Sequence, residues 1–220
     1  MNLRELVDEK HFPLWGLVAS IVGLVFIVTP QFFYVGAEGE PFSMFNHAVS
    51  ELGEVGVSEL AWMFNIGMIL AGILFIPFMI GLGLYIDNII SKLAGLVGVY
   101  SAASIVLVGI YPMNLETIGE HTIAAISFFL SGMILTLLWA VAILAQKEVR
   151  VHKGLSIGGF INMTVFALFL YGPWEGWSGP RPDFSMRLTL EWAIYWAIVG
   201  YLLVLSIYVW RKEKKPESPQ

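Results

Sequence analysis

Long apolar segments alternate with short polar ones along the whole chain. Six runs contain no Asp, Glu, Lys, Arg or His: residues 12–37, 60–86, 93–115, 122–146, 154–174 and 192–210. Each has about 19 residues or more, and a hydrocarbon core of ~30 Å requires roughly 20 residues of helix. Transmembrane strands would need only about 10 residues of alternating polarity, a pattern that these runs lack. The pattern therefore predicts an all-α integral membrane protein, a bundle of six transmembrane helices.

The expected helices lie within these runs. They cover residues 13–33, 60–85, a third segment that ends near residue 111, then residues 121–145, 155–171 and a sixth segment that ends at residue 210. Pro77 predicts a kink in the second helix. Residues 1–210 are expected to form a single membrane domain, and residues 211–220, which are charged and contain proline, a disordered tail.

Composition supports a membrane protein and excludes several other classes. Of the 220 residues, 57% are hydrophobic and only 13% charged, and the mean hydropathy is +0.75, outside the range of soluble domains. The chain has no cysteine, which excludes disulfides, thiolate metal sites and a cysteine nucleophile. It also lacks a basic face, so we expect no nucleic acid among its partners.

The distribution of basic residues predicts the orientation. If both termini are cytoplasmic, ten of the twelve Lys and Arg residues lie inside, and only Arg181 and Arg187 lie outside. Cytoplasmic loops carry an excess of Lys and Arg in most membrane proteins. We therefore predict a multi-pass protein of the cell membrane with cytoplasmic N and C termini.

Polar residues gather in the three connections predicted to lie outside. Because ionisable groups at a hydrocarbon boundary are costly, they are functional candidates by default. Convergence of the three connections would form one outward-facing polar pocket. The candidates for catalysis are Ser50, Glu51, Glu120 and His121, and those for substrate binding are Asn46, Asn65, Asn114, Arg181, Arg187 and Glu191.

One hypothesis for this pocket is a metal site. If residues 46–53 are helical, His47 and Glu51 are four residues apart and share a face. His121 would then complete a set of imidazole and carboxylate ligands that suits Zn²⁺ and leaves a position for water, whose pKa the metal would lower to ~7.

Three alternatives involve the same residues without that metal. The polar segment could be a hydrogen-bonded plug that caps the second helix, with Glu51 orienting His47 and with Arg187 paired to Glu191. Ser50 and His121, with Glu51 or Asp183 as the acid, could form a hydrolase triad, although the G-x-S-x-G pattern is missing. A haem between His47 and His121 is the third alternative.

Several motifs carry a resemblance to a known family. The segment Asn46-His47-Ala48-Val49-Ser50-Glu51-Leu52-Gly53 resembles the signature of the prokaryotic membrane family called domain of unknown function 998. Further matches are Phe64-Asn65-Ile66-Gly67 and Gly109-Ile110-Tyr111-Pro112, which is followed by His121. The resemblance covers about residues 14–210, nearly the whole chain.

The resemblance implies six helices and a membrane location, without an established activity. It nominates Asn46, Ser50, Glu51, Asn65, Pro112 and His121 as positions of functional interest. The chain departs from the expected pattern in its last element, where Arg187 and Glu191 are separated by a helical turn instead of being closely spaced. A looser analogy links the chain to membrane hydrolases similar to alkaline ceramidases and adiponectin receptors, and such an analogy does not transfer function.

Two functional hypotheses follow. The first is an enzyme that hydrolyses a membrane lipid or other amphiphile at the outer face, with Zn²⁺ as the candidate cofactor. The second is a non-catalytic carrier of a small solute or ion, or a module that binds a lipid or a partner. A carrier should place polar groups near the midplane of the membrane, where only Pro77 and Asn162 hint at them.

Overall fold

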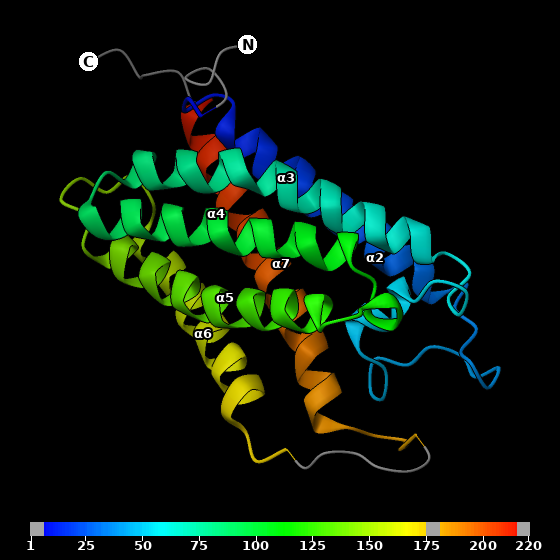
Figure 1. Ribbon diagram of the computed structural model, residues 1–220. Coiled ribbons are helices and arrows are strands. Elements are labelled where there is room, and N and C mark those ends of the chain that lie inside the picture. Colours follow the sequence, from blue (N-terminus) through cyan, green and yellow to red (C-terminus); the bar gives the residue numbers. More distant parts are fainter. Residues whose placement is uncertain (1–6, 175–180, 215–220) are drawn as a thin grey trace.

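The computed structural model describes residues 7–174 and 181–214. Within these residues, six helices are long and apolar enough to cross a membrane, which confirms the predicted six-helix all-α membrane bundle (Figure 1). The helices are α2 (Phe12–Gln31), α3 (Ala61–Ile86), α4 (Ile89–Ile110), α5 (Glu120–Leu144), α6 (Ser156–Tyr171) and α7 (Met186–Glu213). Short 3₁₀ helices occupy three connections: η1 (Val49–Gly53), η2 (Met113–Leu115) and η3 (Lys153–Leu155).

Two helix boundaries differ from the sequence-based expectation. Helix α4 begins at Ile89, because the Asn88 side chain caps it by accepting the Ser91 N–H at 2.9 Å. Helix α7 continues to Glu213, so the first three residues of the predicted tail are helical. Residues 215–220 of that tail lie outside the described part of the chain.

The six helices form a closed ring. Each helix packs against its neighbours in the chain, and α7 closes the ring by packing against α2. Small residues allow close backbone approach between α3 and α4: a side-chain carbon at Gly95 would lie 3.0 Å from the Met79 carbonyl oxygen. Because the chain returns to its starting helix, all six helices surround the middle of the ring.

The start of α2 and the end of α7 lie at the same end of the bundle. There, the Tyr85 hydroxyl donates to the Glu213 carboxylate at 2.6 Å, and Arg150 lies 3.4 Å from Glu9. We call this the inner end, and the opposite end, which holds η1, the outer end. The names follow the topology predicted from the basic residues.

Candidate functional site

The polar segment of residues 46–53 is not one continuous helix. Its 3₁₀ helix begins at Val49, and Ala48 before it is extended, with φ −68° and ψ 154°. His47 therefore lies outside the helix, and the shared helical face on which the metal hypothesis placed His47 and Glu51 does not form. The local reason is that the Glu51 carboxylate bends back and accepts the Ala48 N–H at 2.7 Å, which caps the helix.

The second partner of Glu51 is Arg181, from the connection between α6 and α7. Nη2 of Arg181 lies 2.7 Å from Oε2 of Glu51 and Nη1 lies 3.2 Å from Oε1, so the pair is bidentate. The same guanidinium donates to the Asn46 carbonyl at 2.7 Å. The exposed fraction of the side chain is 10% for Glu51 and 25% for Arg181. Both were predicted as site residues, but the structure joins them to each other.

His47 is enclosed at the outer end of the bundle. Its Nδ1 lies 2.7 Å from the Asn46 side-chain oxygen, and the rings of Tyr34 and Phe42 lie 5.2 and 5.0 Å from the imidazole. Burial lowers the pKa of His47 below its ordinary value, although the nearby carboxylate of Glu51 favours the charged form. These surroundings favour a neutral structural imidazole.

Helix α7 holds this polar segment in place. Glu191 accepts the Val49 N–H at 3.0 Å, and the Trp192 indole donates to the His47 carbonyl at 3.0 Å. Trp192 was not among the predicted site residues. The feature of the sequence that could have identified it is the residue type, because the N–H of a buried indole needs a hydrogen-bond acceptor.

Three other predicted residues bind backbone groups. Asn114 donates to the Val55 carbonyl at 2.9 Å and accepts its N–H at 3.1 Å. Asn65 donates to the Gly53 carbonyl at 3.0 Å. Glu120 accepts N–H groups of the turn before α5, at 2.9 and 3.1 Å. Each of these side chains therefore has a local structural role at the outer end.

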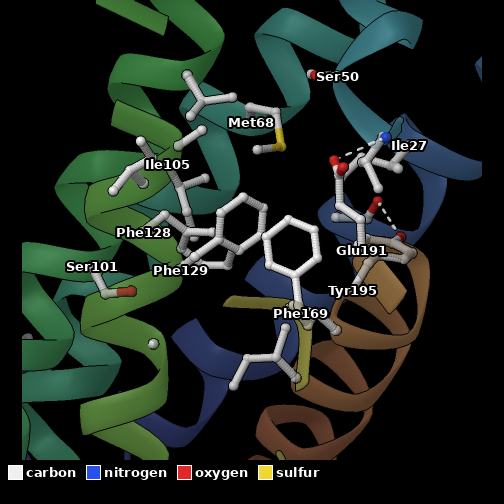
Figure 2. A pocket seen from close by; sticks show the side chains of 18 of the residues that line it. Ile27, Ser50, Met68, Ser101, Ile105, Phe128, Phe129, Phe169, Glu191 and Tyr195 are labelled. Atoms are coloured by element: carbon white, nitrogen blue, oxygen red, sulfur yellow. Dashed lines mark hydrogen bonds between the residues drawn. The ribbon is translucent and has the colours of Figure 1, made fainter. Parts of the chain in front are cut away.

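A pocket of about 580 Å³ lies inside the ring and is lined by all six helices, η1 and η2. Along α7 its lining runs from Arg187 to Leu202, which corresponds to about 20 Å at a rise of ~1.5 Å per residue. Most of the lining is apolar, including the close ring pair Phe129 and Phe169, whose centroids lie 4.4 Å apart (Figure 2). Most of the polar side chains in the lining lie at the outer end: Ser50, His121, Thr122, Arg187 and Glu191. Ser101 and Tyr195 are polar residues that line the pocket farther from this end.

His121 is held in a defined orientation at this polar end. Its Nδ1 lies 2.8 Å from the Tyr111 carbonyl oxygen, which only accepts hydrogen bonds, so Nδ1 carries a hydrogen. In the neutral imidazole Nε2 is then the acceptor. Ser50, in the wall of the same pocket, directs its hydroxyl to the Met113 sulfur at 3.5 Å, a weak contact that is readily exchanged.

Arg187 and Glu191 line the pocket one helical turn apart. The Arg187 guanidinium lies over the Phe169 ring, 5.7 Å from its centroid. In residues 7–174 and 181–214 it forms no hydrogen bond or ion pair, so the predicted Arg187–Glu191 pair is not formed. Figure 2 shows the Glu191 side chain reaching into the pocket toward the segment that carries Ser50.

The proposed metal ligands are not assembled as a group. Among the described residues, no three His, Cys, Asp or Glu side chains are arranged to hold a metal ion. Of the predicted set, Glu51 is bound by Arg181, His47 lies among aromatic rings, and His121 faces the pocket. The physical reason is that the guanidinium neutralises the carboxylate that a cation would need.

These features define a polytopic membrane protein with a polar cap over an apolar cavity inside the helix ring. Residues 18–215 match the model of a family described as protein of unknown function (DUF998). The match covers most of the chain, so the protein belongs to this family, as its motifs suggested. No curated protein and no solved structure matched the chain.

Proposed function

We propose that the protein binds a lipid or other amphiphile, with the apolar tail in the pocket and the polar head at its outer end. The observation that carries this proposal is a mostly apolar cavity of about 580 Å³ in which the charged side chains of the lining, Arg187 and Glu191, lie at one end. Ligand pockets are commonly of this size and are mostly apolar with a few placed polar groups.

The polar end must provide the selectivity. A ligand in water gains ~0.8 kcal/mol for each methylene that it buries. A lipid that is already in the bilayer gains much less, because its tail leaves an equally apolar surrounding. Discrimination among membrane lipids therefore depends on Ser50, His121, Thr122, Arg187 and Glu191, and the cavity mainly sets the tail volume that fits.

Gly23 offers a way to fill the cavity without distorting the fold. It lines the pocket, and a side-chain carbon built on it meets no atom within 4 Å. Gly200 in α7 is equally open but does not line the pocket. We expect Gly23→Phe to lose a bound amphiphile that wild type and Gly200→Phe retain, as measured by native mass spectrometry after purification in detergent. Equal retention by all three proteins would contradict the proposal.

Hydrolysis of the bound amphiphile is a second candidate function. The observation that favours it is that Ser50 and His121 line the same pocket, with His121 Nδ1 fixed by the Tyr111 carbonyl. In this reaction His121 Nε2 would accept a proton from the Ser50 hydroxyl or from a water molecule. Product formation by purified protein in mixed lipid vesicles should then be lost in His121→Gln, while binding persists. Equal turnover by this variant and wild type would exclude the base role of His121.

A further inference from the structure

We propose that the pocket selects an amphiphile with three parts in a fixed order: an oxyanion head, a neck with a hydrogen-bond donor, and a hydrocarbon tail. This proposal rests on the proposed function and adds the chemical class of the ligand. The order follows the lining of α7, in which Arg187 comes first, Glu191 lies one turn deeper, and Ile194, Ile198 and Leu202 continue inward.

Arg187 is the group that meets the oxyanion. Of the two arginines at the outer end, Arg181 is bound to Glu51 and to the Asn46 carbonyl. Arg187 lines the pocket, where its guanidinium lies over the face of the Phe169 ring and interacts with Glu191 through space, without a hydrogen bond or ion pair to it. A guanidinium carries five N–H donors in a plane that fits two oxygens of a phosphate or carboxylate. Arg187 is exposed at the outer end of α7, so its guanidinium is accessible to a ligand head that enters the pocket from that end.

Glu191 is the group that meets the neck. One carboxyl oxygen, Oε1, accepts the Val49 N–H at 3.0 Å, which fixes the side chain across the pocket between α7 and η1. The residue is only partly buried and lines the pocket, so its remaining acceptor capacity faces the cavity. A carboxylate has about four acceptor positions. A hydroxyl or amide N–H on the ligand would occupy one of them.

The tail lies below these two residues. From Glu191 inward, the α7 residues that line the pocket are apolar apart from Tyr195, whose hydroxyl donates to the Gly23 carbonyl at 3.1 Å. No charged side chain of the described residues lines this deeper part of the pocket. A second polar head at the inner end of the ligand would therefore have no charged partner in the cavity.

The experiment uses three single-chain probes with matched monounsaturated hydrocarbon tails. The first is a lysophosphatidate, which has a phosphate and a free hydroxyl on its neck. The second is its deoxy analogue without that hydroxyl, and the third is an oleyl trimethylammonium cation. Each is titrated by native mass spectrometry into full-length wild type and into Arg187→Gln, Glu191→Gln and Arg211→Gln. Arg211 is the control, because it is an exposed arginine at the inner end of the same helix.

Wild type should bind the phosphate probe at least about tenfold more tightly than the cation, and Arg187→Gln should remove that preference, as expected for a lost charge-assisted hydrogen bond. The control Arg211→Gln should keep it. The free hydroxyl should improve wild-type binding about tenfold, and Glu191→Gln should reduce this advantage, because a neutral amide accepts the hydroxyl hydrogen more weakly than a carboxylate does. The glutamine side-chain oxygen can still accept the Val49 N–H. The substitution therefore keeps the hydrogen bond between α7 and η1 and replaces the second carboxyl oxygen with an NH₂ group.

The possible outcomes separate the two proposals. If Gly23→Phe displaces a bound amphiphile while wild type shows no preference for the phosphate or the hydroxyl, amphiphile binding in the pocket is supported and the head-group assignment is overturned. Equal phosphate preference in Arg187→Gln and wild type overturns the role of Arg187. If wild type binds none of the probes and retains no amphiphile, both proposals fail.

Discussion

The Glu51–Arg181 ion pair joins two connections that lie 130 residues apart in the chain and closes the outer end of the bundle. We predict that Glu51→Gln destabilises the protein strongly. Removing one partner of a buried ion pair commonly costs ~3–5 kcal/mol, because the other charge stays buried without compensation. In the variant, the Glu40 carboxylate, which lies 3.7 Å from the Arg181 guanidinium, still compensates part of the arginine charge. The expected cost is therefore ~2–3 kcal/mol, which corresponds to a decrease of roughly 4–12 °C in the melting temperature for a chain of this size.

A double-mutant cycle tests this reasoning. Thermal unfolding in detergent is compared for wild type, Glu51→Gln, Arg181→Gln and the double variant. The two costs should not add, and the coupling energy should be about 1–3 kcal/mol. Asp87→Asn is a control, since Asp87 forms an ion pair of similar length, 2.8 Å, with Lys92 in an exposed position. Exposed pairs contribute little, so it should unfold like wild type. Strictly additive costs for Glu51 and Arg181 would refute the reasoning.

Three further predictions concern pH, packing and topology. Burial lowers the pKa of His47, so the unfolded chain binds a proton more readily than the folded one, and stability should fall as the pH decreases below ~6.5. In His47→Gln the melting temperature should depend less on pH in this range. Parallel profiles of melting temperature against pH for the variant and wild type would contradict this prediction. Asn65→Ala should cost ~1 kcal/mol of unfolding free energy, because the Gly53 carbonyl loses its donor; an unchanged melting temperature would refute that role. The cysteine-free chain suits labelling: Glu38→Cys should react with an impermeant maleimide in intact cells and Lys147→Cys only after lysis, and the reverse pattern would invert the topology.

Part of the site was accessible from residue types alone. Asn46, Ser50, Glu51, His121, Arg181, Arg187 and Glu191 were all proposed from their positions at the predicted outer boundary, and the structure places all of them at the outer end. Their partners were not accessible in the same way. The chain contains several acids near the two outer arginines, and nothing in their spacing indicates that Glu51 binds Arg181 while Arg187 remains in the pocket wall.

The sequence by itself determined the six membrane helices and their approximate ends, because bilayer thickness turns the length of an apolar run into a span. Only the tertiary structure decided how the ring closes, with α7 against α2, and hence that an apolar cavity lies inside it beneath the polar cap. Inside a membrane, residues facing lipid and residues facing a cavity are equally apolar, so hydropathy does not distinguish them. The polar segment at residues 46–53 likewise owes its shape to distant residues, Arg181, Glu191 and Trp192, whose contacts depend on how the helices pack.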